Sequence, residues 1–142
     1  MATSGHITSV SLVPPDASAP EEALAALAAA DQIILGPGSL FTSVLAAAIV
    51  PSLRQVLHQA RERVVYVCNL RPQIPETAGY DVAAHVDALA AHGVEPAAVV
   101  WDPAAMAAGA IAIPEWASAL AREDGSGHDP ARLAKALVDL LV

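Results

Sequence analysis

Three polar segments of the sequence come directly after apolar runs, and each carries side chains that could bind a ligand. Residues 36–39 (GPGS) follow QIILG, residues 69–73 (NLRPQ) follow RVVYVC, and Asp102 with Pro103 follows AAVVW. The carboxyl ends of the strands in a parallel sheet open at one edge, and ligands of such folds bind there. We therefore expect the three segments to meet at one site.

The first segment has the residue types of a loop that binds an anion. Gly36 and Gly38 allow backbone angles that other residues avoid, and they let a ligand approach the main chain closely. Ser39, Thr42 and Ser43 add hydroxyl groups at the start of a predicted helix, where free amides and the helix dipole favour negative charge. There is no lysine at the Walker position, so this is not a P-loop. The alternative is a tight strand-to-helix turn whose hydroxyls only cap the helix.

The second segment contributes an amide and a cation. Asn69 could orient a polar ligand, and Arg71 could pair with a phosphate through two parallel hydrogen bonds. The alternative is a solvated arginine next to an asparagine that bonds to its own loop. Gln73 is a further candidate for the same site. His128 is another, although it could instead support the cap at Asp129 before the last predicted helix.

Other reactive side chains do not form a metal site or a catalytic set. His85 and His92 lie on one helical face, but no carboxylate completes a zinc ligand set at a suitable spacing, so we expect both at surface or amphipathic positions. Cys68 lies in a predicted strand and is expected to be a small core residue. No nucleophile with an adjacent base can be picked out, which argues against a hydrolase. We expect no catalytic residue, no metal and no cofactor.

Length, composition and charge limit the class of protein. The 142 residues are 55% hydrophobic, which suits one α/β domain over residues 1–142. The net charge of −8 argues against a surface that binds nucleic acid or an anionic membrane. The start of the chain lacks the features of a signal peptide, and the apolar run at residues 44–50 is too short to span a bilayer. We therefore expect a cytoplasmic protein.

The elements that must position these residues alternate between strands and helices. Short β-branched runs predict strands at residues 6–14, 32–36, 63–70, 96–103 and 109–114. Alanine- and leucine-rich segments predict helices at residues 18–31, 39–49, 51–60, 80–93 and 128–142, with Pro51 between the second and third. Asp81 and Asp129 are the expected N-caps, Gly93 a C-cap and Pro130 a first helical residue. This alternation predicts a mostly parallel sheet with helices on both faces.

Several segments together resemble one known family. ILGPGSLFTSVL, VPSLRQVL, VYVCNLRPQIPETAGYDVAAHVDAL and GHDPARLAKALVDLL are similar, in this order, to the carboxyl half of the YvcK-like gluconeogenesis factors. These factors belong to the same superfamily as the 2-phospho-L-lactate transferases (CofD-like). The resemblance implies a Rossmann-like fold, truncated at the amino end. It also implies binding of a UDP-sugar such as UDP-N-acetylglucosamine, and a role in carbon metabolism, cell wall synthesis and cell shape. No settled reaction comes with the factor subfamily.

The resemblance also assigns residues to the nucleotide site. It implies a phosphate-facing loop made of Gly36, Pro37, Gly38, Ser39, Leu40, Thr42 and Ser43. It places Asn69, Arg71 and Gln73 next to this loop, and His128 and Asp129 match a His-Asp pair that is frequent in the family. The family's Gly-rich first loop and its acidic, metal-associated motif have no counterpart in this sequence. Half of the nucleotide site is therefore expected to lie outside it.

Three functions remain open at this point. The first is a regulatory protein that binds a nucleotide sugar. The second is a transferase that moves phospho-lactate onto a deazaflavin, which would need the acidic motif. The third is an interaction module that pairs with a separate amino-terminal half or with a second copy, because an open parallel sheet exposes an edge. Residues 104–117, rich in alanine, are a candidate surface for such pairing.

Overall fold

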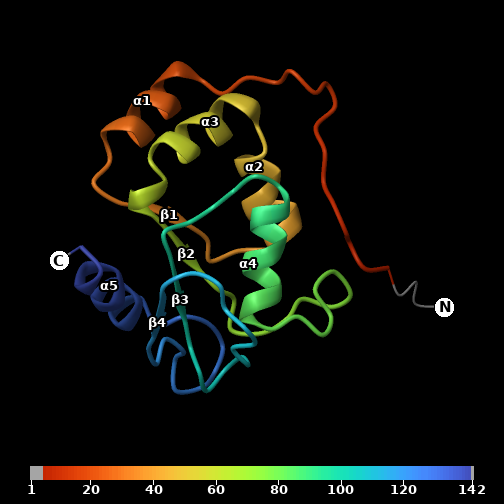
Figure 1. Ribbon diagram of the computed structural model, residues 1–142. Coiled ribbons are helices and arrows are strands. Elements are labelled where there is room, and N and C mark those ends of the chain that lie inside the picture. The colour runs from red at the N-terminus through yellow and green to blue at the C-terminus, as the bar shows by residue number, and fades with distance from the viewer. Residues whose placement is uncertain (1–4, 142) are drawn as a thin grey trace.

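The centre of the protein is a parallel β-sheet. The structure, a computed structural model, describes residues 5–141. Within them the sheet has four strands in the order β1 (Ile33–Leu35), β2 (Val64–Val67), β3 (Ala98–Trp101) and β4 (Glu115–Ala117) (Figure 1). Each strand pairs with the next in parallel. The carboxyl ends of all four strands therefore lie at the same edge of the sheet, as the sequence predicts.

Helices precede β1, connect β1 to β2 and β2 to β3, and follow β4. They are α1 (Glu21–Ala29), the π-helical turn η1 (Leu40–Leu45), α2 (Ala46–Ala48), α3 (Pro51–Gln59), the 3-10 turn η2 (Arg61–Arg63), α4 (Val82–Ala91) and α5 (Pro130–Asp139). The predicted break before Pro51 is confirmed, since this residue occupies the first turn of α3. Across residues 5–141, no single helix combines the length and the apolar composition needed to cross a membrane. Leu40–Ala48 and Pro51–Gln59 satisfy both conditions only together, and they are bent by 81° at the break.

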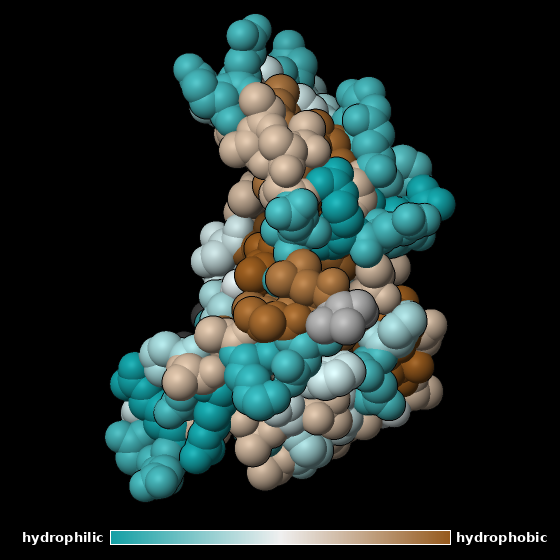
Figure 2. All heavy atoms as spheres, turned by 90° about the vertical axis from the view of Figure 1, so that its left-hand side faces the viewer, coloured by the Kyte–Doolittle hydropathy of each residue, from teal (hydrophilic) through white to brown (hydrophobic). Residues whose placement is uncertain are grey.

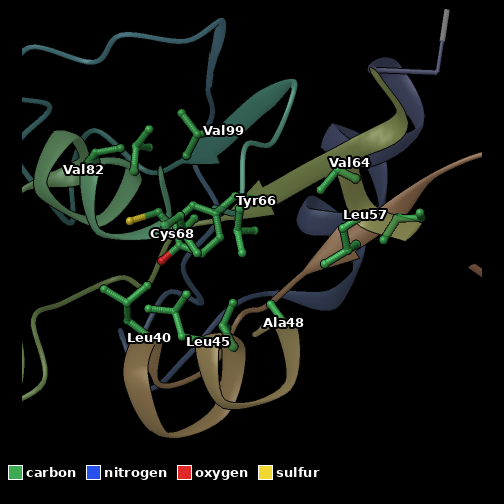
Figure 3. Packing of buried hydrophobic residues seen from close by; sticks show 14 of the residues in the cluster. Leu40, Leu45, Ala48, Leu57, Val64, Tyr66, Cys68, Val82 and Val99 are labelled. Carbon is green, nitrogen blue, oxygen red and sulfur yellow. The ribbon is translucent and has the colours of Figure 1, made fainter. Parts of the chain in front are cut away.

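The two faces of the sheet are covered by different helices. Alternate residues of β2 point to opposite faces, so Val64 and Tyr66, with Cys68 just beyond the strand, pack beneath η1 and α2–α4, as Figure 3 shows. Val65 instead joins a smaller cluster with Ala136 of α5 on the opposite face. The expected arrangement, helices on both faces of a parallel sheet, is confirmed.

The helix ends explain why α4 and α5 start where they do. The Asp81 carboxylate accepts a hydrogen bond from the Ala84 amide at 2.8 Å, and the Asp129 carboxylate accepts from two amides at the start of α5. Both predicted N-caps are confirmed. The C-cap of α4 is His92, and Gly93 is the next residue, with φ of +75°. Gly93 still ends the helix, because it adopts the left-handed conformation that the last turn requires.

Two predicted strands differ from the structure. Residues 6–14 form no strand; Val10 there donates its amide to Nε2 of His92 rather than to a sheet neighbour. The predicted strand at residues 109–114 is displaced, because the strand β4 begins at Glu115. The Pro114 carbonyl accepts from the Val99 amide at 3.0 Å and aligns the chain for this pairing.

Residues 104–117, predicted as a candidate interaction surface, are exposed over most of their length, and Trp116 is 38% exposed, but a few of their side chains pack inward. Met106 is buried, with its sulfur 3.8 Å from the Cys68 sulfur, and Ile111 and Ile113 pack against the main core. The Val82 and Ala83 amides donate to carbonyl groups of the same segment. Met106, Ile111 and Ile113 therefore contribute to the core of this domain, while the exposed remainder of the segment stays a candidate interaction surface.

His85 is fully buried on α4, so of the two predicted alternatives, a surface or an amphipathic position, the surface position is wrong. Its ring packs edge-on against Tyr80, with ring centroids 5.4 Å apart. Nδ1 lies 2.7 Å from the Asp81 carbonyl and must donate a proton to it, while Nε2 is buried without a partner. Burial lowers the pKa of His85, against the opposing effects of the Asp81 backbone and charge. The folded protein therefore holds His85 as a neutral ring.

We expect protein stability to fall as the pH drops from 7 to 5. The folded-state pKa of His85 lies below its unfolded value, so below about pH 6.5 the unfolded chain takes up the proton first. The loss is about 1.4 kcal/mol for each unit that separates the two pKa values. Urea unfolding across this range should show a shallower loss for His85→Phe. The exposed His58→Phe variant should keep the wild-type slope, and equal slopes in all three proteins would contradict the assignment.

Candidate functional site

The first two predicted segments meet in one cleft at the carboxyl edge of the sheet. The cleft has a volume of about 390 Å³ and is lined by Pro37, Gly38, Asn69, Leu70, Arg71, Pro72, Gln73, Gly127 and His128. It thus joins the loop after β1, the loop after β2 and the segment before α5. The third predicted segment supplies no residue of this cleft, so its predicted place in the site is wrong. Asp102 instead lines a neighbouring pocket that shares Leu70 and Arg71 with the cleft, and it has a different role.

Three side chains of this cleft carry polar atoms without a partner. Asn69 Nδ2, Gln73 Oε1 and His128 Nε2 are buried and form no hydrogen bond in the described part of the chain. Buried polar groups in folded proteins are nearly always hydrogen-bonded, because an unmet group costs about 1–3 kcal/mol. Three such atoms around one cleft are the arrangement expected where a polar ligand completes the bonding.

Asn69 connects the two loops. Its Oδ1 accepts a hydrogen bond from the Gly38 amide at 3.3 Å. This bond fixes the orientation of the side-chain amide, so that Nδ2 remains as a donor. The alternative in which Asn69 bonds to its own loop is therefore wrong, since its Oδ1 binds the loop after β1.

Gln73 is held by a short turn. The backbone amide of Gln73 donates to the Thr77 hydroxyl at 2.7 Å. The backbone amide of Thr77 donates in return to the backbone carbonyl of Gln73 at 2.7 Å. Thr77 is fully buried. These contacts hold the Gln73 backbone, so its side chain can reach the cleft from a fixed position.

The two glycines of the first loop have different roles. Gly36 has φ of +84°, and a Cβ there would lie 3.0 Å from the Val67 carbonyl oxygen, so only glycine fits. Gly38 does not adopt a positive φ, and a Cβ there would meet Ser43 and Val44 at ordinary contact distances. The prediction of an unusual backbone conformation is confirmed for Gly36 and wrong for Gly38.

The hydroxyl groups of Ser39 and Thr42 in this loop already have partners. Ser39 Oγ donates to the Glu76 carboxylate at 3.0 Å, and Thr42 Oγ1 donates to Ser39 Oγ at 2.5 Å. Leu40 is fully buried and belongs to the core. Ser43 lines a separate apolar groove beside β1. Since a carboxylate accepts from Ser39, the open part of the site lies toward Asn69 and Gln73 rather than over the hydroxyls.

Arg71 lies at the rim of the cleft. Its side chain is exposed, and one guanidinium nitrogen donates to the Gly125 carbonyl at 3.1 Å. A guanidinium has five N–H donors, so this bond leaves the group able to bind an anion as well.

His128 enters the cleft from the other side. Burial lowers its pKa, while a hydrogen bond to the Cys68 backbone and the negative charge of Asp102 act in the opposite direction. The described part of the chain offers Nε2 no hydrogen-bond partner, and in the neutral ring with Nε2 unprotonated this atom is an acceptor. From the sequence, His128 could be a residue of the ligand site or a support for the cap at Asp129. The structure places it in the cleft, while Asp129 alone caps α5.

Asp102 anchors the segment that carries His128. Its carboxylate accepts from the amides of Ala104 at 2.9 Å, Leu120 at 2.7 Å and Ala121 at 3.0 Å. Burial acts to raise the pKa of Asp102, but these three amides together hold it below its ordinary value. No local pattern indicates this role, because Leu120 lies 18 residues from Asp102 in the chain.

Two further observations are relevant to catalysis. Burial raises the pKa of Cys68 to about 12, so its sulfur stays a thiol near neutral pH. Among residues 5–141, no three His, Cys, Asp or Glu side chains are grouped in a way that could hold a metal ion.

Comparison with known proteins agrees with this fold. The model of the family described as 2-phospho-L-lactate transferase CofD matches residues 2–130. The gluconeogenesis factor of Halalkalibacterium halodurans is 42% identical over 86 residues, which are 61% of this chain and 27% of that protein. A relative from Thermoanaerobacterium thermosulfurigenes is 45% identical over 89 residues, or 63% of this chain and 28% of its own length.

Solved structures of similar proteins have the same fold. A crystal structure described as a member of the UPF0052 family from Bacillus halodurans has a TM-score of 0.78 and 26% identity, and covers 90% of this chain. A second structure from that organism has a TM-score of 0.82, 26% identity and 94% coverage. The chain spans 49% and 51% of these two structures. Fold, matched residues and relatives agree, and the chain belongs to the CofD family, among the homologues of the gluconeogenesis factors.

Proposed function

We propose that this protein is a gluconeogenesis factor-like regulator and that its cleft binds a UDP-sugar of the UDP-N-acetylglucosamine type. The observation that supports it most is the group of three buried, unpartnered polar atoms on Asn69, Gln73 and His128. The regulatory role in carbon metabolism, cell wall synthesis and cell shape rests on the family, whose relative in Halalkalibacterium halodurans is named a gluconeogenesis factor.

The chemistry of the cleft suits the neutral part of such a ligand. Asn69 Nδ2 is a donor, while Gln73 Oε1 and the unprotonated His128 Nε2 are acceptors. Hydroxyl and amide groups of a nucleoside or an N-acetyl sugar can pair with all three. Arg71 at the rim is the group that would pair with the diphosphate. A site of this kind binds through polar contacts and requires no reaction.

A second candidate is transfer of phospho-lactate to a deazaflavin, and the description of the matching family favours it. The two functions differ in what the protein binds. A deazaflavin is fluorescent, so its anisotropy should rise on binding if this is a transferase. Under our proposal it stays at the free-ligand value while UDP-N-acetylglucosamine still binds.

We expect saturable binding of UDP-N-acetylglucosamine by isothermal titration, and a Kd about tenfold higher or more in Gln73→Leu and in His128→Phe. Each variant leaves a ligand group without its partner, and a loss of about 1.4 kcal/mol is a factor of ten in Kd. Gln55→Leu and His58→Phe, exposed positions on α3, are matched controls and should bind as the wild type does. Absence of binding at millimolar ligand, or equal Kd values in all five proteins, would contradict the proposal.

A further inference from the structure

An extended segment at the amino end of the described chain lies against the helices that cover the larger core. We call residues 5–19 the strap; they form no helix and no strand. In Figure 1 the strap, in red, runs along the outside of the helical layer, past α2 and α4. Ile7, Val10 and Leu12 pack against the core. Figure 2 shows the other side of the molecule, where a band of hydrophobic residues crosses a hollowed face, so the strap covers a different apolar surface.

Two hydrogen bonds join the strap to the rest of the described chain. The Val10 amide donates to Nε2 of His92 at 3.1 Å, and the Ala19 amide donates to Oγ of Ser52 at 3.0 Å. Both acceptors are side chains, but only the imidazole changes charge near neutral pH. A turn at residues 13–16 separates the two attachments. The Val10 end and the Ala19 end can therefore respond differently to pH.

Both hydrogen bonds of the His92 ring require the same neutral tautomer. Nδ1 lies 2.7 Å from the Ala88 carbonyl oxygen, which can only accept, so Nδ1 carries the proton. Nε2 of the neutral ring is then an acceptor, and the Val10 N–H donates to it. The ring also packs edge-on against Phe41 of η1, with the ring centroids 6.2 Å apart. His92 is therefore held in place, and the strap uses its one acceptor.

A second proton on this ring removes the bond to the strap. The proton enters at Nε2, which then becomes a donor and faces the N–H donor of Val10. The bond from Nδ1 to Ala88 needs no change, so the ring can stay in place while the strap moves. Since two donors cannot bond to each other, the Val10 amide must turn to water, and the contacts of Val10 with the core weaken with it.

The charged groups around the ring do not replace this bond. Within the described residues, none of them forms an ion pair with His92. The side chain of Arg54 packs against Gly93, the residue after His92, and η1 contains no charged residue. The titratable and charged groups of the strap, of α3, of α4 and of the segment after α4 are His6, Asp16, Arg54, His58, His85, Asp87 and Glu95. They carry both signs, so the bond to Val10 is the contact that protonation of His92 changes most.

We propose that His92 is a pH-sensitive latch for the strap. At about pH 8 the neutral ring holds Val10, and the apolar side chains of the strap cover the core. At about pH 5 the protonated ring releases Val10, and residues 5–12 leave the core while Ala19 stays bound to Ser52. The latch opens one segment rather than the whole domain, which separates it from the effect expected for His85. No lining residue of the ligand cleft belongs to the strap, so the latch is independent of the proposed function.

Hydrogen exchange of single amides, followed by NMR on the complete chain, tests the latch. The protection factor of an amide is the exchange rate expected in an unfolded chain divided by the observed rate. For Val10 it should fall about tenfold or more between about pH 8 and pH 5, as expected for the loss of one hydrogen bond. For Ala19, whose acceptor is a hydroxyl, it should stay constant. The ¹⁵N signals of the His92 ring should show the Nδ1–H tautomer at the higher pH.

Three variants assign the effect to His92. His92→Phe keeps a ring against Phe41 but offers no acceptor, so Val10 should be poorly protected at both pH values. His92→Gln supplies an uncharged acceptor, so the protection of Val10 should no longer depend on pH. His6→Phe, at an exposed position of the strap, should keep the wild-type response.

Other results overturn the proposal. Equal protection of Val10 at the two pH values in the wild type would show that the ring does not release the strap. A pH response of Val10 that survives in either His92 variant would assign the response to another group. An equal fall in protection at Ala19 would show that the whole domain opens rather than the latch.

Discussion

Asp102→Ala lowers the free energy of unfolding by about 3–5 kcal/mol, because three backbone amides lose their acceptor at once. Each unmet buried amide costs about 1–3 kcal/mol, and the lower part of the sum applies because Ala104 is exposed to water. The effect also reaches the ligand cleft. Leu120 accepts from the Asp129 amide at 2.7 Å, so loss of the anchor frees the segment that carries His128.

Urea unfolding at pH 7 measures this loss. Asp129→Ala is the matched control, because it removes an exposed aspartate that caps α5, and it should lose only about 1 kcal/mol. Asp102→Asn should fall between the two, since an amide oxygen still accepts but carries no charge. A loss in Asp102→Ala no larger than in Asp129→Ala would show that the three bonds contribute little.

The second large effect is expected for Gly109→Ala, with a loss of about 2–4 kcal/mol. Gly109 has φ of +68°, which costs a residue with a side chain about 1–2 kcal/mol. A Cβ at this position would also lie 2.3 Å from Oδ2 of Asp81. The carboxylate must move, and the N-cap of α4 is worth about 1 kcal/mol.

Gly79→Ala separates the two causes. Gly79 has φ of +79°, but a Cβ there meets nothing within 4 Å, so only the backbone cost applies. Thermal unfolding should therefore give a larger drop in Tm for Gly109→Ala than for Gly79→Ala. Asp81→Ala in the Gly109→Ala background should cost little more, because the cap is already lost. Equal drops for the two glycine variants would contradict the predicted clash.

Local patterns made much of the fold predictable from the sequence. The central predicted strands at residues 32–36, 63–70 and 96–103, the N-caps at Asp81 and Asp129 and the break before Pro51 depend on residues close together in the chain. The structure confirms them. The convergence of the loops after β1 and β2 follows from parallel pairing alone. These features need no knowledge of distant contacts.

The rest depends on contacts between distant residues, which no local pattern records. Residues 6–14 have an apolar strand-like composition, but His92 of the α4 cap binds Val10. Ser39 has the chemistry of a group that binds anions, but its hydroxyl donates a hydrogen bond to the carboxylate of Glu76, 37 residues away. The burial of His85 depends on how α4 packs, which periodicity gives only approximately.

The central claim is that Asn69, Gln73 and His128 together bind the ligand, and NMR of the side-chain amides tests it most directly. In a titration of ¹⁵N-labelled protein with UDP-N-acetylglucosamine, the side-chain NH₂ signals of Asn69 and Gln73 should shift and saturate with one common Kd. The side-chain signals of Gln55 and Gln59, at exposed positions on α3, should stay in place. Shifts confined to other parts of the protein, or none at saturating ligand, would contradict the account.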